Sequence, residues 1–195
     1  MNTVTAELRS PAAKAKRLRR AGIIPCAVYG GSLPEPLLIQ MDQRTVNRLL
    51  QGKRVGSKVQ LEVGGKTIQS LIKEISRNSV NQEVEHIGFQ ALSADRKVNS
   101  VAQVVLLNKD SVDGLVEQML FEIPYSAFPG DMIDTVTIDL TNYGVGSTLT
   151  VGELEAFKKE NIDLHVDADA VVFKIEERTH AAATEEESSD ENTGE

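Results

Sequence analysis

The sequence predicts a mainly β protein with a few helices, in which a small barrel or strongly curled sheet precedes a second β-rich domain and an acidic tail. Three observations predict this class. Short apolar segments alternate with polar residues at the period of two that strands have. Glycine-rich turns separate these segments, so that six or so strands fit within fewer than 100 residues. Apolar residues make up 41% of the chain but aromatic residues only 4%, and an aliphatic core suits strands better than ligand-stacking pockets.

The two halves of the chain carry charges of opposite sign. Residues 1–100 contain 16 lysines and arginines against 8 aspartates and glutamates, whereas residues 101–195 contain 5 against 21. The resulting charges of +8 and −16 sum to the −8 of the whole chain. We therefore expect a basic domain over residues 1–93 that attracts a polyanion, an acidic domain over residues 98–178, and a disordered acidic tail over residues 179–195.

The chain is expected to begin with a strand and a helix. The strand, residues 3–9, alternates apolar and polar side chains. Ser10 is a typical N-cap residue, Pro11 is typical of the first helical position, and Gly22 is typical of a helix end. These signals predict a helix near residues 11–21.

A central strand and a second helix follow. The almost continuous apolar run over residues 24–29 predicts a strand buried on both faces, ended by Gly30-Gly31. A further strand is expected at residues 37–41. Asp42 then caps a helix that ends at Gly52, because Val46, Leu49 and Leu50 recur at helical spacing.

A hairpin and a closing strand complete the basic domain. Residues 59–63 and 66–76 flank Gly64-Gly65, a pair typical of a two-residue hairpin turn. The alternation in the second of these strands slips near Leu71-Ile72, which predicts a bulge. The last strand is expected at residues 84–92.

The acidic domain also has the pattern of strands and turns. Strands are expected at residues 101–107, 116–123, 136–140 and 170–175. A proline-containing loop is predicted over residues 125–131 and a short helix over residues 150–157.

The most informative stretch for function is a cluster of five cations in seven residues. Its members are Lys14, Lys16, Arg17, Arg19 and Arg20. On a helix they occupy most of the perimeter and repel one another unless an anion neutralises them. An RNA backbone would do so with favourable counterion release, and amide groups at the helix start would add donors to a phosphate. The alternative is a solvated basic helix whose cations pair with surface carboxylates.

A second candidate region lies on the strands. Tyr29 ends an apolar strand, where it either stacks on a base or is an ordinary tyrosine at the edge of the core. In the strand over residues 84–92, His86 shares the face opposite Ile87 and Phe89, so it is expected to point away from the core, beside Arg77. A polar sheet face of this kind can lie along a nucleic-acid groove.

Nothing in the sequence indicates catalysis or a bound cofactor. Phosphate-binding glycine loops, dinucleotide fingerprints and nucleophile elbows are missing. One cysteine and three histidines cannot form a convincing metal site. The pairs Asp131 with Asp134 and Asp167 with Asp169 have the pattern of solvated turns. We therefore expect a cytoplasmic protein that is not an enzyme and has no cofactor, metal, small-molecule substrate or membrane span.

Several motifs resemble one family in order and spacing. In the basic domain they are Ala6-Glu-Leu-Arg9, Lys16-Arg-Leu-Arg19, Gly22-x-x-Pro-x-Ala-Val-Tyr-Gly-Gly31, Lys73-Glu-Ile-x-Arg77 and His86-Ile-x-Phe89. In the acidic domain they are Leu120-Phe-Glu-Ile-Pro-Tyr125, Ile138-Asp-Leu140 and Gly146-Ser-Thr-Leu-Thr-Val-Gly-Glu-Leu154. Over residues 3–177 the chain resembles the bacterial large-subunit ribosomal protein L-twenty-five, in its two-domain Ctc form, a general stress protein.

This resemblance implies a six-stranded, barrel-like N-terminal domain that binds 5S rRNA in the central protuberance of the large subunit, next to other ribosomal proteins. On matching positions, the RNA contacts implied by the resemblance are Arg9, Lys16, Arg17, Arg19, Tyr29, Lys73, Arg77 and His86. Lys14 and Arg20 join this set as members of the basic cluster.

The chain departs from the family's pattern at three places. Residues 10–16 lack the usual glycine-flanked lysine loop, Arg77-Asn78-Ser79 replaces Arg-His-Pro, and Gly88 replaces an acidic residue. One missing RNA contact would cost about 1–3 kcal/mol. A second hypothesis is therefore a ribosome-associated stress or protein-interaction adaptor with weakened RNA binding.

Overall fold

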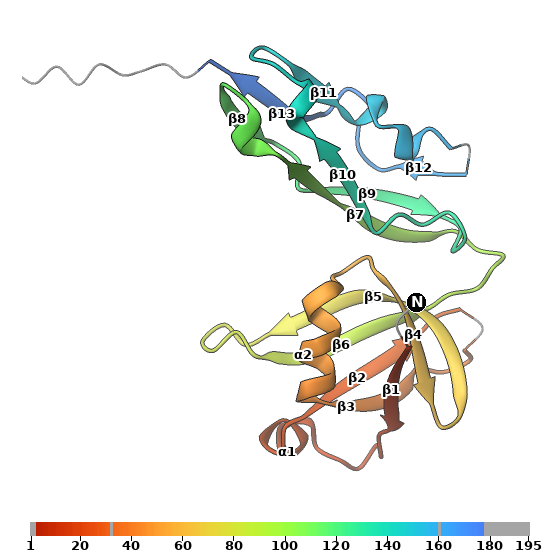
Figure 1. The fold of residues 1–195 in the computed structure, drawn as a ribbon. Helices are drawn as coiled ribbons and strands as arrows, with labels where there is room; N and C mark the ends of the chain where they lie inside the picture. Colours follow the sequence, from red (N-terminus) through yellow and green to blue (C-terminus); the bar gives the residue numbers. More distant parts are fainter. Residues whose placement is uncertain (1–2, 32, 160, 178–195) are drawn as a thin grey trace, which may run out of the picture.

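Six strands close into a barrel in the N-terminal part of the computed structural model, which describes residues 3–31, 33–159 and 161–177 (Figure 1). The strands are β1 (Thr3–Leu8), β2 (Ile23–Tyr29), β3 (Leu37–Asp42), β4 (Lys58–Val63), β5 (Lys66–Arg77) and β6 (Val84–Ala91). Their order is β1-β3-β2-β6-β5-β4, and β4 pairs with β1 to close the ring. The predicted fold class is confirmed. The predicted acidic tail, residues 179–195, lies outside the described residues.

Side-chain alternation explains the core of the barrel. Ile24, Cys26 and Val28 of the central strand β2 are buried and join Ile39 and Phe89 in one hydrophobic cluster. The strand pairs with β3 on one side and in parallel with β6 on the other. Leu8 is an exception, because it is 59% exposed at the end of β1 although its alternation with Val4 and Ala6 places it on the inner face.

The β4–β5 hairpin has the predicted turn and the predicted bulge. Gly64 and Gly65 connect Val63 to Lys66 with φ of 56° and 78°, both in the left-handed region that a two-residue turn of this type requires. The β5–β6 register shifts between Ile72 and Glu74, so Lys73 is the extra residue.

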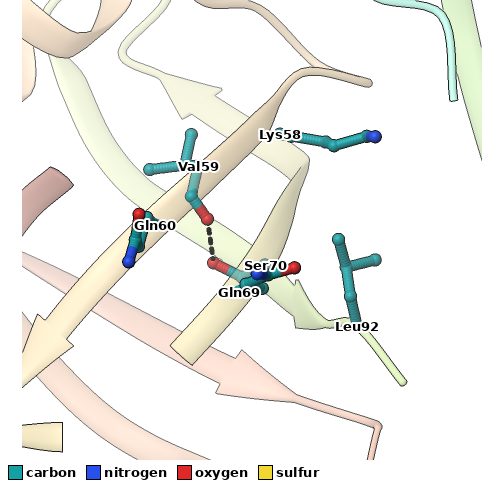
Figure 2. Close-up of a pocket in the computed structure, with 6 residues that line it drawn as sticks. All are labelled: Lys58, Val59, Gln60, Gln69, Ser70 and Leu92. Atoms are coloured by element: carbon teal, nitrogen blue, oxygen red, sulfur yellow. Dashed lines mark hydrogen bonds between the residues drawn. The ribbon is translucent and has the colours of Figure 1, made fainter. Parts of the chain in front are cut away.

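A small hollow lies beside this hairpin, between β4, β5 and Leu92 (Figure 2). The Ser70 hydroxyl donates to the Val59 carbonyl oxygen at 3.2 Å across its wall. The volume of the hollow is about 10 Å³, enough for roughly one water molecule. The hollow is therefore too small to hold a substrate.

The first helix is shorter than the sequence predicted. It is α1 (Ala15–Arg20), and its N-cap is Lys14 without a side-chain cap. The amide of Ala13 donates to the carbonyl of Ser10 at 3.0 Å, so Ser10 and Pro11 form a turn instead of the first helical turn. The prediction of a helix near residues 11–21 was wrong at its start, and no phosphate-binding helix start lies at Pro11. Gly22, with φ of 75°, follows the helix as predicted.

The second helix, α2 (Gln43–Gly52), agrees with the prediction. The Asp42 carboxylate accepts a hydrogen bond from the amide of Thr45 at 2.9 Å. Val46 and Leu49 are buried against the barrel, and Leu50 is half-buried.

The C-terminal part contains two sheets around a second hydrophobic core. One sheet has the order β10-β7-β9-β12, with β7 (Val98–Leu107), β9 (Glu122–Ala127), β10 (Thr135–Asp139) and β12 (Asp163–Leu164). The other has the order β11-β13-β8, with β8 (Leu115–Gln118), β11 (Thr148–Thr150) and β13 (Val171–Glu176). Four short 3₁₀ helices lie between the strands: η1 (Lys109–Ser111), η2 (Leu140–Asn142), η3 (Val151–Glu153) and η4 (Glu155–Phe157).

Three predictions for this part were wrong in detail. The segment 116–123 is divided between β8 and β9, in different sheets, because Met119, Leu120 and Phe121 between these strands are apolar and give no turn signal for the break. The predicted loop 125–131 begins later, since the fully buried Tyr125 lies within β9. The predicted helix 150–157 consists of the two short turns η3 and η4.

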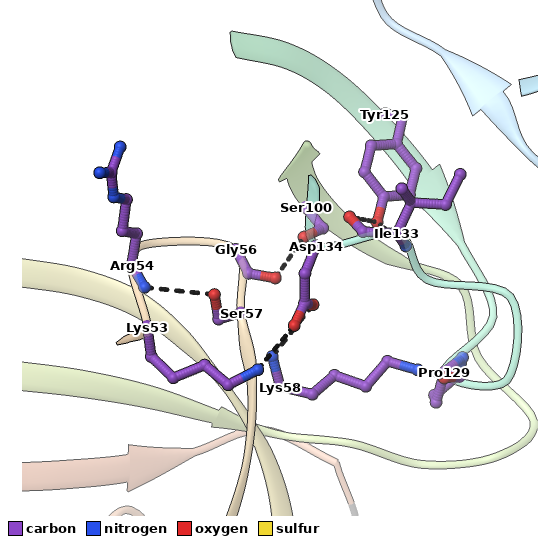
Figure 3. A network of polar contacts seen from close by, with 10 residues as sticks. All are labelled: Lys53, Arg54, Gly56, Ser57, Lys58, Ser100, Tyr125, Pro129, Ile133 and Asp134. Atoms are coloured by element: carbon purple, nitrogen blue, oxygen red, sulfur yellow. Dashed lines mark hydrogen bonds and ion pairs between the residues drawn. The ribbon is translucent and has the colours of Figure 1, made fainter. Parts of the chain in front are cut away.

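Polar contacts join the barrel to the C-terminal part (Figure 3). The Lys53 ammonium lies 2.7 Å from an Asp134 carboxylate oxygen, and the Lys58 ammonium donates to the carbonyl of Pro129. The Ser100 hydroxyl donates to the Gly56 carbonyl oxygen at 3.0 Å. Asp134 was predicted as a solvated turn residue, but its carboxylate makes one of these contacts.

Candidate RNA interface

Four cations of the basic cluster are exposed on and next to α1. They are Lys14, Lys16, Arg17 and Arg20. The ion pairs within 4.0 Å in the described part of the chain are Lys53–Asp134, Lys97–Asp163 and Lys174–Glu176, and none involves the cluster. The alternative that these cations pair with surface carboxylates therefore finds no such pair among the described residues. The cluster keeps a concentrated positive charge available to a polyanion.

Two arginines of the candidate set hold α1 in place. The half-buried Arg19 donates to the carbonyl of Glu85 on β6, at 3.4 Å, and so ties the helix to the sheet. Arg9 donates to the carbonyl of Ala13 at 2.7 Å and braces the turn that precedes the helix. Its buried Nε has no hydrogen-bond partner within the described chain. Arg9 and Arg19 thus position the cluster as well as adding to its charge.

A groove of about 540 Å³ separates α1 from the hairpin that joins β5 and β6. Lys16, Arg19 and Arg20 line its basic side, and Asn78, Glu83 and Glu85 line the other. The Asn78 amide donates to a Glu85 carboxylate oxygen at 3.0 Å, which holds that carboxylate against the hairpin.

Arg77 lies at the start of the same hairpin. Its guanidinium donates to the carbonyl of Gln82 at 3.2 Å, and its side chain is exposed. The hairpin places this cation near the groove, because the next residue, Asn78, lines the groove. Val84, which pairs with Arg77, lines it as well.

The outer face of β2, β6 and β5 forms the second half of the site. His86 and Tyr29 are half-buried on it. The Nδ1 atom of His86 lies 2.9 Å from the carbonyl oxygen of Pro25. Because a carbonyl only accepts, Nδ1 carries the proton, and Nε2 of the neutral ring is an acceptor. Burial, and to a lesser extent the nearby Glu74 carboxylate, raise the pKa of Tyr29, so its hydroxyl is a donor at neutral pH.

Gly88 lies between Tyr29 and Glu74 on this face. A side-chain carbon built at Gly88 would be 3.5 Å from the Glu74 Cβ and 3.5 Å from a ring carbon of Tyr29. The strand register also pairs Glu74 with Gly88. A carboxylate is therefore present next to Gly88, although position 88 itself has none. The sequence prediction missed Glu74, because the Lys73 bulge changes which residues of β5 face outward.

Lys73 lies apart from the basic cluster. Its ammonium donates to the carbonyl of Asn99, at the start of β7, at 3.0 Å. The bulge therefore directs this predicted RNA contact toward the junction with the C-terminal part.

Comparison with known proteins gives consistent results for both parts of the chain. Residues 4–89 match the Ribosomal L25p family, and residues 97–179 match the family described as Ribosomal protein TL5, C-terminal domain. A large ribosomal subunit protein bL25 from Xanthomonas oryzae pv. oryzae is 30% identical over 161 residues, which cover 78% of this chain and 76% of the relative. The chain belongs to the ribosomal L25p family.

Two further relatives have the same printed name. The protein from Halothermothrix orenii is 29% identical over 199 residues, covering 95% of this chain and 87% of the relative. The protein from Desulfatibacillum aliphaticivorans is 29% identical over 178 residues, covering 88% and 80%. The family resemblance that the sequence motifs indicated is confirmed, and all ten candidate RNA-binding residues lie within the part that matches the ribosomal L25p family.

The described residues of this family member include neither a membrane-spanning helix nor a cluster of metal-ligating side chains. No described helix is long and apolar enough to cross a membrane. No group of three or more histidine, cysteine, aspartate or glutamate side chains is arranged there to hold a metal ion.

Proposed function

We propose that the protein is a structural constituent of the large ribosomal subunit that binds 5S rRNA in the central protuberance, in the cytoplasm. The observation that carries this proposal is the group of exposed cations on and next to α1, which have no carboxylate partner within 4.0 Å among the described residues. In this role the protein is not an enzyme and needs no cofactor. Its further partners are ribosomal proteins next to 5S rRNA.

In the proposed complex, Lys14, Lys16, Arg17 and Arg20 neutralise phosphates of the RNA. Each neutralised phosphate releases condensed counterions, which makes binding favourable and dependent on salt. Arg9 and Arg19 fix the helix, so that the cations are already arranged before RNA arrives. Phosphate contacts of this kind set the position of the protein on the RNA.

The outer face of β2, β6 and β5 recognises the shape of the RNA in this proposal. Tyr29 donates a hydrogen bond from its hydroxyl, and Nε2 of His86 accepts one. Such groups suit the 2′-hydroxyls and base edges in the shallow minor groove of an RNA helix. Arg77 adds a cation at the edge of this face.

The charge distribution supports two domains with separate roles. We propose that residues 1–93 form the RNA-binding domain and that residues 98–178 form a second domain. The acidic second domain repels the RNA backbone and therefore faces solvent or protein. Lys73 belongs with the junction between them, where it donates to the Asn99 carbonyl.

The experiment is a charge-removal series on the full chain. Replacing Lys16, Arg17 and Arg20 by glutamine should lower 5S rRNA affinity about 10- to 100-fold in 100 mM salt and reduce the slope of log affinity against log salt by about 3, roughly one per lost phosphate contact. Affinity is measured by filter binding at several salt concentrations.

A matched control removes three exposed cations elsewhere on the barrel. The variant with Arg44, Arg48 and Lys66 replaced by glutamine carries the same net charge, and these residues lie on α2 and at the β4–β5 hairpin. It should keep most of the affinity and slope. If both triple variants lose affinity equally, the barrel attracts RNA only through its overall charge, and α1 is not the binding site.

A further inference from the structure

We propose that the free edge of β10, in the acidic C-terminal part, binds an extended basic peptide segment of another protein by adding it to the sheet as a strand. This inference uses no residue of the RNA interface and goes beyond the proposed function.

The edge of β10 is open for pairing. β10 ends the sheet order, and its parallel register with β7 runs without interruption from Thr135 to Asp139. The amide of Gln103 donates to the carbonyl of Asp134, so the alternate residues Val136 and Ile138 direct their backbone groups to β7. The backbone groups of Thr135 and Thr137 consequently point away from the sheet, and no strand of the described chain pairs with them.

The strand also lacks the features that usually prevent pairing at an edge. Proteins protect exposed edges with lysine, proline, a bulge or a covering segment. The sequence Thr135-Val-Thr-Ile-Asp139 contains neither lysine nor proline, and its register has no bulge. A continuous five-residue edge is long enough to bind a short peptide through main-chain hydrogen bonds.

A groove of about 520 Å³ runs along this edge and provides space for side chains of the added strand. Tyr143, Leu149, Leu154 and Ala156 supply its apolar surface. In strand addition, alternate side chains of the peptide enter such a groove and the others face solvent. The groove therefore suits a peptide with an apolar residue at every second position.

The charge of the groove selects a basic partner. Asp139, Glu153 and Glu155 line it, and no lysine or arginine does. Asp139 Oδ1 accepts from the amide of Thr141 at 3.0 Å, and Glu153 Oε2 accepts from the amide of Thr150 at 2.8 Å. These bonds hold the two carboxylates in position, whereas Asp139 Oδ2 and Glu153 Oε1 have no hydrogen bond within the described residues.

The same charges disfavour two other occupants. An RNA strand would bring phosphates against three carboxylates. A second copy paired through β10 would bring six carboxylates together, and like charges across an interface are costly. A peptide with lysine or arginine beside alternate apolar residues satisfies both the backbone edge and the charge.

The test uses the full chain and a ten-residue peptide of alternating lysine and valine with blocked ends. Fluorescence anisotropy should show saturable binding, and hydrogen exchange should show new protection of the Thr135 and Thr137 amides. A peptide N-methylated at every second residue should bind at least about tenfold more weakly, since it loses several main-chain hydrogen bonds. This comparison leaves the protein unchanged, so it does not depend on the folding of a variant.

Protein variants locate the site. Thr137→Pro removes an outward amide but no bond to β7, so the strand should tolerate it while peptide affinity falls about tenfold. Glu155→Gln should weaken binding several-fold and lower its salt dependence, whereas Asp113→Asn, an exposed carboxylate outside the groove, should not. Equal binding of the two peptides would overturn strand addition. Self-association that Thr137→Pro abolishes would assign the edge to a second copy instead.

Discussion

At Gly56 the backbone of the barrel lies close to the backbone of β7 in the C-terminal part. Its φ is 90°, and a side-chain carbon built there would be only 2.3 Å from the carbonyl oxygen of Val101. Only glycine fits both the conformation and the space. The sequence Val55-Gly-Ser57 does not reveal this constraint, because it depends on a residue 45 positions later in the chain.

The substitution Gly56→Ala should therefore be strongly destabilising. We expect a loss of about 2–4 kcal/mol in the free energy of unfolding, since strain at a left-handed position adds to the clash with backbone. Gly130→Ala is the control, because no atom lies within 4 Å of its added carbon. It should change stability by less than about 0.5 kcal/mol. Urea unfolding of both variants measures the difference, and equal stability would show that the close approach does not exist in solution.

The buried thiol of Cys26 makes the free energy of unfolding depend on pH. Burial raises the pKa of its thiol from 9.0 to about 12, although the backbone of Ile87 partly offsets this by hydrogen bonding. The native state therefore keeps a proton that the unfolded chain releases near pH 9. The stability that the protonated Cys26 thiol contributes is complete below pH 9 and is lost as pH rises from about 9 to 12.

In that window the free energy of unfolding should fall more steeply in the wild-type chain than in Cys26→Ala. The difference in slope should approach about 1.4 kcal/mol per pH unit near its middle. Tyrosines titrate in the same range but are common to both proteins, so they cancel in the comparison. Urea unfolding at pH 8 to 11 provides the measurement, and parallel curves would mean that the thiol is accessible in the native state.

At the scale of elements, the two helices of the barrel differ in how they begin. The Asp42 carboxylate caps α2 by accepting from the Thr45 amide, and hydrogen bonds to Thr45 lower its pKa. Lys14 occupies the same position before α1 and makes no such bond. An N-cap side chain satisfies an amide that the helix itself cannot.

Removing each side chain tests this difference. Asp42→Ala should cost about 1 kcal/mol of stability, whereas Lys14→Ala should stay within about 0.5 kcal/mol, as for an ordinary surface residue. Thermal unfolding of the two variants measures both losses of stability. Equal costs would contradict the assignment of Asp42 as the cap.

Sequence patterns predicted the elements that depend on local chemistry. The strands of the barrel, the Gly64-Gly65 turn, the bulge and α2 follow from alternation, turn residues and a cap. The start of α1 was missed because Ser10-Pro11 is equally suited to a turn. The break between β8 and β9 was missed because Met119, Leu120 and Phe121 between them are apolar and carry no turn signal, and only tertiary pairing separates the two strands into different sheets.

At the scale of the whole molecule, the charge asymmetry of the sequence corresponds to two hydrophobic cores, one in the barrel and one around the C-terminal sheets. The basic and polar residue types of the candidate RNA interface came from the sequence alone and remain a prediction. It did not predict that Arg9 and Arg19 brace the helix, that Glu74 stands beside Gly88, or that Lys73 turns to the junction. Each of these depends on contacts between segments distant in sequence or on a register shift.

The most direct test of the account is a salt titration of the full chain with 5S rRNA, in which tRNA competes. A specific 5S rRNA site on α1 and the outer sheet face predicts tight binding that excess tRNA does not displace, with affinity that falls steeply as salt rises. Weak binding that tRNA displaces would contradict it. The basic helix would then be a general polyanion surface, and the hypothesis of a protein-interaction adaptor would replace the ribosomal RNA site.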